Sequence, residues 1–274
     1  MESNLKILYN PPMIIDFILF AITGAIAGTA AGLLGIGGGM IVVPCLAFVF
    51  THTGLAPESI MHTASATSLA AMVFTASMST YSHNKREAVL WSIFRRLLPG
   101  IIIGTVLGMF LASTLSTEVL KIIFAIFLLL IAIRMFLNYK PKVARGLPGS
   151  LSKFGIAMAI GGKSGLLGVG GGALMVPFLI HCNIPIRKAA GTSAACGLPI
   201  AIAGTLSAII TGWHVDPGEL YTFGYVFWPA ALIIAIFSMS FVFLGAKLSH
   251  VLPVNTIRRV FAVVLLLAAI NLFY

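Results

Sequence analysis

The chain has 274 residues, of which 59% are hydrophobic and only 9% are charged, and its formal net charge is +10. A water-soluble domain carries about a quarter of its residues as charged side chains, so this composition excludes an ordinary soluble enzyme. It predicts an all-α polytopic membrane protein. The 17 lysines and arginines lie mainly in short connections between apolar segments, which favours a role in membrane orientation over nucleic-acid binding.

Apolar segments follow one another along the chain, and the longer ones reach the ~20 residues that a helix needs to span a bilayer. The first half holds 14–33, 40–50, 62–82, 93–112 and 118–138, and the second holds 151–167, 173–182, 188–211, 223–246 and 255–273. The segments 40–50 and 173–182 are too short to cross, and a glycine cluster precedes each. Each is expected to form a glycine-broken re-entrant helical hairpin with the preceding segment, because irregular backbone at membrane depth needs protein or water around it.

The chain contains the same sequence twice. The thirteen residues from Gly32 to Pro44 return as Gly165 to Pro177, with nine identities at an offset of 133. We therefore divide the chain into repeat 1 (1–140), a basic linker (141–152) that is predicted to be cytoplasmic, and repeat 2 (153–274), all within one membrane domain.

The charges of the loops indicate how the two repeats are oriented. If each hairpin enters and leaves on one side, 13 basic residues fall on one side, which the positive-inside rule places in the cytoplasm, with both termini outside. These residues lie in loops 83–96, 139–153, 183–188 and 247–259. Loop 83–96 is basic, whereas its counterpart 212–222 contains Asp216 and Glu219 and no lysine or arginine. The halves are therefore predicted to be inverted-topology repeats, each with one hairpin and three transmembrane helices, as in many secondary transporters.

The glycine clusters are the strongest functional signal. Each precedes a half-helix, expected to begin at Met40 or Ala173, whose free N–H groups and dipole attract an anion. We predict a substrate site for a small anion at Gly37, Gly38, Gly39, Gly170, Gly171 and Gly172. The alternative is that these glycines only allow close helix packing, which does not explain four glycines within five residues in both halves.

Other glycines recur every four residues. Gly24, Gly28 and Gly32 form one such series, and Gly100, Gly104 and Gly108 form another. These series are predicted to be stripes at which helices pack closely.

Polar side chains in the apolar segments extend the predicted site. Thr67-Ser68 and Thr192-Ser193 occupy equivalent positions and are expected to donate hydrogen bonds to the anion. The alternative is a bond to the preceding turn of the same helix or a hydrogen bond between helices. Lys163 lies inside an apolar segment, opposite Ala30 in the other repeat. An ionisable residue there is a functional-site hypothesis, so Lys163 either attracts the anion or extends to the membrane surface as an anchor.

Metal and catalytic chemistry have little support. His62, His181 and Cys182 lack the repeated spacing and the carboxylates of a metal site, so no metal and no cofactor are predicted. The spans contain no catalytic arrangement, so we expect no enzyme. The segment 157–164 matches a loose nucleotide-binding pattern, but it is apolar, so transport is expected to use a proton or sodium gradient. Asp16 and Glu58 are candidate proton relays on the outer side.

The doubled G-L-L-G-x-G-G-G-x-x-x-x-P motif resembles that of the TauE/SafE family of sulfite and organosulfur exporters. The resemblance extends from about Asp16 to Leu272 and includes Ala66-Thr67-Ser68 and Gly191-Thr192-Ser193, whereas Lys163 is not part of the family pattern. It implies an inner-membrane permease that moves sulfite, sulfoacetate or other organosulfonates. Two alternatives stay open: a passive anion channel, and a membrane metal or redox protein that uses His181 and Cys182.

Overall fold

The computed structural model describes residues 12–34, 38–55, 57–137, 146–214, 221–251 and 254–273. The helices of repeat 1 are α1 (Pro12–Leu34), α2 (Gly39–Thr53), α3 (Ile60–Lys85), α4 (Trp91–Thr114) and α5 (Thr117–Phe136). Those of repeat 2 are α6 (Ser150–Leu167), α7 (Gly172–His181), α8 (Ile186–Thr211), α9 (Trp228–Val251) and α10 (Val254–Phe273), with strands β1 (Thr222–Phe223) and β2 (Val226–Phe227) before α9. The described chain is thus almost entirely helical, as predicted.

Length and hydropathy together distinguish the helices that can span a membrane from the others. Five helices of the described chain contain stretches long and apolar enough to cross a membrane, in α1, α4, α5, α8 and α9. At 1.5 Å per residue, the 15 residues of α2 and the 10 residues of α7 extend only about 22 and 15 Å, short of the ~30 Å hydrocarbon core. These short helices follow the two glycine clusters, as the sequence indicates.

One predicted segment begins differently. The apolar stretch 223–246 was expected to be helical throughout, but residues 222–227 form an antiparallel hairpin in which Thr222 pairs with Phe227. The backbone φ angles of Tyr221 and Gly224 are +74° and +59°, values that a right-handed helix does not contain. Helix α9 therefore begins only at Trp228.

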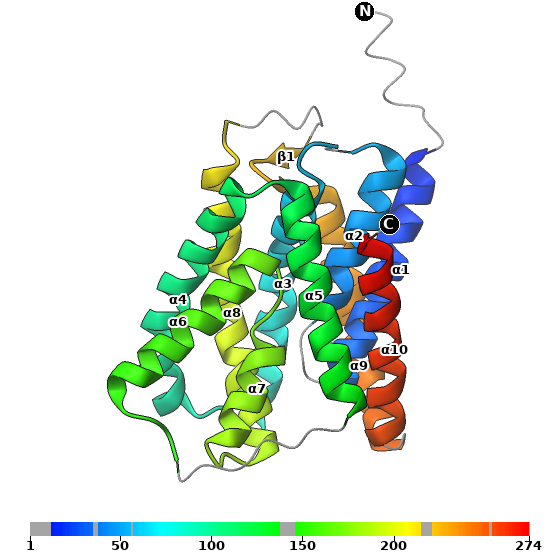
Figure 1. The fold of residues 1–274 in the computed structure, drawn as a ribbon. Helices are drawn as coiled ribbons and strands as arrows, with labels where there is room; N and C mark the ends of the chain where they lie inside the picture. The colour runs from blue at the N-terminus through cyan, green and yellow to red at the C-terminus, as the bar shows by residue number, and fades with distance from the viewer. Residues whose placement is uncertain are drawn as a thin grey trace, which may run out of the picture.

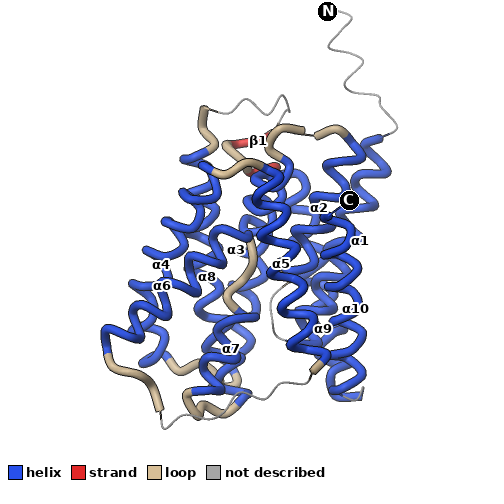
Figure 2. The backbone as a smooth tube through the Cα atoms, in the orientation of Figure 1, coloured by secondary structure: helices blue, strands red, loops and turns tan. Residues whose placement is uncertain are grey.

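The two short helices turn back inside the bundle. Figure 1 shows that α1 begins and α2 ends at the end of the bundle that carries the β1–β2 hairpin, whereas α6 begins and α7 ends at the opposite end. In Figure 2 the loop from α6 to α7 lies within the bundle. The second chain break therefore lies inside the bundle, whereas residues 35–37 of the first lie outside the described residues.

Helices from different halves pack in pairs. The main pairs are α1 with α9, α4 with α6, α3 with α8 and α5 with α10. In the α4–α6 pair, Gly104 and Gly108 lie against the backbone of Met158 and Gly162, where any side chain would clash. Three other stripe glycines pack in the same way: Gly24 on Ile234, Gly28 on Ser238 and Gly100 on Phe154. The prediction that these glycines mark close helix crossings is confirmed.

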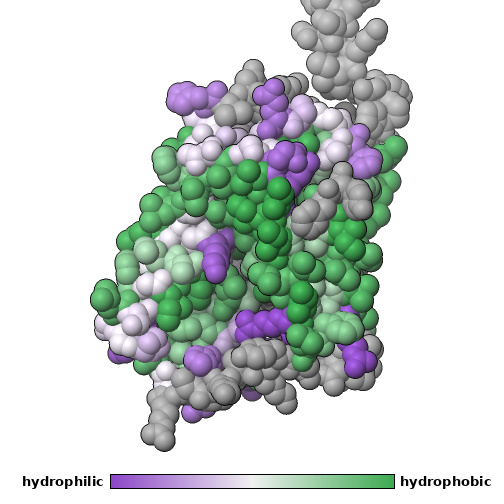
Figure 3. Space-filling view, viewed as in Figure 1, coloured by the Kyte–Doolittle hydropathy of each residue, from purple (hydrophilic) through white to green (hydrophobic). Residues whose placement is uncertain are grey.

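The surface is that of a membrane protein. Figure 3 shows a broad band of hydrophobic residues between more polar ends. Large apolar side chains such as Phe110 and Leu130 are about 60% exposed on α4 and α5; water would oppose this exposure, whereas lipid favours it. Together with the five long apolar helices, this surface identifies a polytopic, all-α membrane protein.

Basic side chains gather at one end of the bundle. Lys85 and Arg86 at the α3–α4 connection and Arg187 and Lys188 at the α7–α8 connection are exposed, and Figure 1 shows both connections at the end opposite the β1–β2 hairpin. The chain termini and residues 141–145 of the linker lie outside the described residues. Their predicted locations stay predictions.

Candidate functional site

The two glycine motifs meet inside the bundle. Gly39, the first residue of α2, lies against the loop between α6 and α7: a β-carbon built on it would be 3.0 Å from the carbonyl oxygen of Gly168 and 3.1 Å from the Cα of Val169. Gly39 and the second break, residues 168–171, are buried there. The structure therefore brings Gly39 of one half next to Gly168 and Gly170 of the other, and Gly171 and Gly172 follow these in the chain. Gly38 contacts Ala27 of α1, and Gly37 lies outside the described residues.

The local backbone explains why glycine is needed at the second break. Gly168 ends α6 in the left-handed region, with φ of +66°, and its N–H bonds to the Gly165 carbonyl. A β-carbon on Gly168 would also lie 2.5 Å from the Cα of Ser65. The break is thus formed by a turn that only glycine adopts easily, pressed against α3.

The helix that follows this break begins without a cap. Gly171 precedes α7 and offers no side chain to its N-terminus, and only the N–H groups of Leu174 and Met175 bond back to the Gly171 carbonyl. The N–H groups of Gly172 and Ala173 have no hydrogen-bond partner within the described ranges, although both residues are buried. Unpaired N–H groups at a buried helix start are suited to an anion or water.

The predicted serines lie in the buried part of the bundle but differ in their hydrogen bonds. Ser68 on α3 donates from its Oγ to the Gly168 carbonyl at 2.9 Å and so holds the second break. Its counterpart Ser193 on α8 is 1% exposed, and its Oγ has no hydrogen-bond partner in the described part of the chain. A buried hydroxyl without a partner is costly, so Ser193 is a candidate for binding a ligand.

The predicted threonines tie the halves to each other. The Thr67 Oγ accepts a hydrogen bond from the N–H of Phe227, directly before α9, at 3.1 Å. The Thr192 Oγ accepts one from the N–H of Leu90, directly before α4, at 2.9 Å. Each threonine therefore holds the start of a helix that belongs to the other half, which is the hydrogen bond between helices that the sequence left open as the alternative.

Lys163 lies on the side of α6 that faces away from α4. Gly161 and Gly165 press on the α4 backbone at Ile101 and Thr105. Lys163 is two residues from each glycine, about 200° around the helix, so it faces away from α4, and it is exposed. It has no side-chain partner among the described residues, and the structure does not join it to the glycines and serines.

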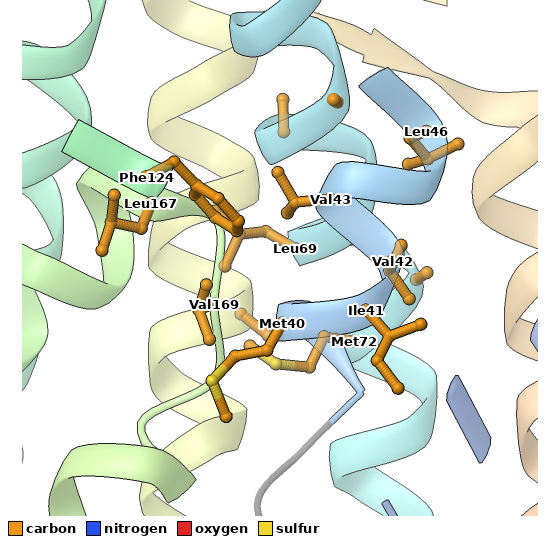
Figure 4. Packing of buried hydrophobic residues seen from close by; sticks show 14 of the residues in the cluster. Met40, Ile41, Val42, Val43, Leu46, Leu69, Met72, Phe124, Leu167 and Val169 are labelled. Carbon is orange, nitrogen blue, oxygen red and sulfur yellow. The ribbon is translucent and has the colours of Figure 1, made fainter. Parts of the chain in front are cut away.

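Apolar side chains that the sequence reasoning missed fill the space around the breaks. Figure 4 shows Met40 and Met72 beside Val169, with Leu69 nearby. The Met72 sulfur lies 2.7 Å from where a β-carbon on Gly170 would be, and Ile200 occupies the same place at Gly171. The sequence signal for Met72 and Ile200 is their position on α3 and α8, one and two turns beyond the predicted serines.

The two hairpins are covered unequally. Helix α10 packs against α1 and α2, and a largely apolar cavity of about 420 Å³ lies between these three helices. In the described part of the chain, α5 packs closely on neither α6 nor α7. Ten of the 15 residues of α2 are buried, against four of the ten residues of α7. The second hairpin is therefore the more accessible one.

Within the described ranges, no three His, Cys, Asp or Glu side chains gather closely enough to hold a metal ion. His181 is exposed and ends α7, whereas the adjacent Cys182 is buried. The chemistry that the site offers is therefore hydrogen bonding from backbone and hydroxyl groups.

The chain is similar to known proteins over nearly its whole length. The chain is 36% identical to a probable membrane transporter protein of Haemophilus influenzae, over 93% of this chain and 97% of that relative. It is 28% identical to the probable membrane transporter protein YunE of Bacillus subtilis, over 94% and 98% of the two chains. A probable membrane transporter of Methanocaldococcus jannaschii is 29% identical, over 88% and 89%. No solved structure matches the chain.

The match to a family is equally extensive. Residues 20–272 match the family described as Sulfite exporter TauE/SafE, a range that includes both glycine breaks and both pairs of hydroxyl residues. With relatives named as transporters and five long apolar helices in its described part, the protein is a multi-pass membrane transporter. The chain belongs to the TauE/SafE sulfite exporter family.

Proposed function

We propose that the protein is a secondary transporter that moves small sulfur-containing anions, such as sulfite, sulfoacetate or other organosulfonates, across the inner membrane. One observation supports this most: the two glycine motifs, from opposite halves, are in contact. A β-carbon added to Gly39 would lie 3.0 Å from the carbonyl oxygen of Gly168. The family supports the sulfur chemistry of the substrate. The anion would be held by N–H groups of Gly172 and Ala173 and by the Ser193 hydroxyl.

The two halves would act as inverted repeats. Matching α1–α5 to α6–α10 in order makes the α1–α9 and α4–α6 pairs counterparts of each other. The same matching relates the hydrogen bonds of Thr67 and Thr192. With the basic connections in the cytoplasm, both termini and the β1–β2 hairpin would lie outside.

Alternating access would arise from the unequal cover of the two hairpins. In this state α10 closes over α1 and α2, and α5 leaves α7 open toward the basic, cytoplasmic end. The opposite state would exchange these contacts, with α5 closing and α10 opening. Exposed Lys163 on α6 would attract the anion toward the open side, and a proton or sodium gradient would drive the cycle.

The experiment is sulfite uptake into liposomes that contain the purified protein, under imposed proton or sodium gradients. We expect uphill accumulation that collapses with an ionophore for the coupling ion. Accumulation that is undiminished when both gradients are dissipated would contradict ion coupling. Purely downhill flux would indicate a channel, and absence of sulfite flux and binding would contradict the substrate class.

Ser193→Ala tests the site itself. Removing a buried hydroxyl without a protein partner should leave thermal stability unchanged or slightly higher, because no protein hydrogen bond is lost. A hydrogen bond to a charged group contributes about 1.5–3 kcal/mol, so sulfite affinity should fall roughly tenfold or more. Ser240→Ala, which removes an exposed hydroxyl bonded to its own helix at Ile236, is the matched control and should change neither quantity.

A further inference from the structure

A buried histidine lies at the hairpin end of the bundle, away from the glycine breaks. His62, the third residue of α3, is 9% exposed. Its Nε2 lies 3.0 Å from the Ala112 carbonyl oxygen and 3.1 Å from the Leu115 carbonyl oxygen. Because carbonyl oxygens only accept hydrogen bonds, Nε2 bears a proton and donates to both. Ala112 lies in the last turn of α4, where its carbonyl also accepts the N–H of Leu115 at 3.1 Å, and Leu115 is the residue directly after the helix.

The same ring contacts the other half of the chain. The imidazole stacks on the ring of Tyr225, with 5.0 Å between the centroids and 26° between the planes. Tyr225 lies in the turn of the β1–β2 hairpin, and Phe227, which leads into α9, is bound to Thr67. His62 therefore connects the end of α4, in repeat 1, with the start of α9, in repeat 2. If the halves move relative to each other, this contact has to change.

The second ring nitrogen has no partner. Nδ1 of His62 is buried and makes no hydrogen bond in the described part of the chain. Because Nε2 already bears a proton, Nδ1 of the neutral ring is an unused acceptor, and it is the atom that takes up the next proton. Once protonated, Nδ1 becomes a donor that needs an acceptor, and the packed surroundings supply none.

Among the residues that the structure describes, the other titratable groups near this end are Asp16 on α1, His52 on α2, Glu58 before α3, Glu118 and Lys121 on α5, His214 after α8, and Tyr221 and Tyr225 around the hairpin. Glu118 and Lys121 pair with each other at 3.2 Å, and Glu58 contacts Thr117 through its backbone carbonyl. Among the described residues, no carboxylate contacts the imidazole. Within the described ranges, a protonated His62 would therefore lack both an anionic partner and a hydrogen-bond acceptor for Nδ1, unless water reached the ring.

We propose that His62 is a proton-binding site that controls opening at this end of the transporter. The neutral ring holds α4 and the β1–β2 hairpin together, and a proton taken from the adjacent aqueous phase onto Nδ1 favours separation of these elements, so that water can accept the new hydrogen bond. In the separated state, the carbonyl end of α4 still stabilises the cation. The inference rests on the proposed function, because it identifies the coupling ion of that transporter as a proton.

The expected pH dependence follows from linkage. A hydrated imidazole titrates near its ordinary pKa of about 6.5, whereas the packed ring stays neutral. Below that pH, each unit shifts the ratio of open to closed molecules up to tenfold toward open. Above about pH 7.5 the contact is closed and His62 no longer responds.

The experiment measures this movement without a substrate. Spin labels are placed at Thr114→Cys in the last turn of α4 and Phe223→Cys in β1, both exposed, after Cys45, Cys182 and Cys196 have been replaced. Distances between the labels are recorded in liposomes from pH 8 to pH 5. We expect a longer-distance population that grows as the pH falls through about 6.5.

Two variants separate proton binding from general pH effects. His62→Gln retains an N–H donor but does not titrate in this range, so its distances should not depend on pH. His52→Gln is the matched control, because His52 is exposed near the end of α2 at the same end of the bundle; it should respond as the wild type does. A wild type without a pH response, or an unchanged response in His62→Gln, would overturn the proposal.

Failure of the transport proposal has a different signature. If sulfite is neither bound nor moved but the pH response of the labels depends on His62, the substrate assignment fails and the proton site stands. If sulfite accumulates under a proton gradient equally well in wild type and His62→Gln, the proton acts elsewhere and the inference about His62 fails.

Discussion

The second break depends on single glycines, whose backbone conformation and close contacts other residues would not allow. At Gly168, a left-handed φ of +66° coincides with direct contact on the α3 backbone. Elsewhere on α6, Gly155 is helical and exposed, and a β-carbon there would meet no atom within 4 Å. The two glycines of one helix thus have different physical roles, which allows a matched comparison.

Gly168→Ala should destabilise the protein strongly. The left-handed conformation costs an alanine about 1–2 kcal/mol, and the clash with Ser65 adds to this. We expect the midpoint of thermal unfolding in detergent to fall by about 5 °C or more. Gly155→Ala, in a helix with free space, should leave it unchanged or raise it slightly. Equal midpoints for the two variants would show that the turn at Gly168 tolerates a side chain.

At the scale of elements, close crossings between halves hold the bundle together. Two such crossings involve α4 with α6 and α1 with α9, and in each of them glycines bring one backbone onto another. Inside a bilayer the hydrophobic effect does not drive helices together, so close packing and hydrogen bonds have to do so. The reciprocal hydrogen bonds of Thr67 and Thr192 then fix where α9 and α4 begin.

Gly108→Ala should weaken the α4–α6 crossing. The added methyl group would overlap the backbone of Gly162, and overpacking of this kind costs about 1–3 kcal/mol. The same substitution on the facing helix, Gly162→Ala, is the control. Its β-carbon would lie 3.4 Å from the Gly104 carbonyl oxygen, which is an ordinary contact. Unfolding midpoints of the purified variants should therefore differ, with Gly108→Ala lower; a lower midpoint for Gly162→Ala would contradict the observed register of the pair.

At the scale of the whole molecule, the two hairpins differ in what covers them. Their sequences are nearly the same around the breaks, but α10 covers the first hairpin and α5 leaves the second more exposed. Two homologous halves in different packing states are what alternating access requires. The two hairpins also differ in charge, because α6 carries Lys163 where α1 has Ala30 at the equivalent position.

Lys163→Met should slow sulfite uptake at low substrate concentration if Lys163 attracts the anion. The effect should be a few-fold at about 0.01 M salt and should largely disappear near 1 M, where the Debye length falls from about 30 to about 3 Å. Lys121→Met removes a lysine that is already paired with Glu118 and is the control. Undiminished uptake by Lys163→Met at low salt would assign Lys163 to membrane anchoring.

The sequence was sufficient for the features that depend on local pattern. Hydropathy and length predict the apolar helices and the two short segments, a four-residue glycine period predicts the stripes at Gly28 and Gly104, and the duplicated motif predicts two equivalent breaks. These predictions succeed because a helix in lipid has to satisfy its own backbone, so its residues alone determine it. The hairpin at 222–227 is an exception, because its turn depends on positive φ angles at Tyr221 and Gly224.

Contacts between distant residues were decided only by the tertiary structure. Ser68 meets Gly168 across 100 residues of sequence, Thr67 meets Phe227 across 160, and His62 meets Ala112 across 50. A hydroxyl or imidazole in a sequence has many possible partners, and its role follows from the one that packing brings within about 3 Å. For that reason the sequence alone indicated a broken, duplicated helical bundle, whereas packing between the halves determined which polar groups hold the fold and which, like the Ser193 hydroxyl, have no protein partner.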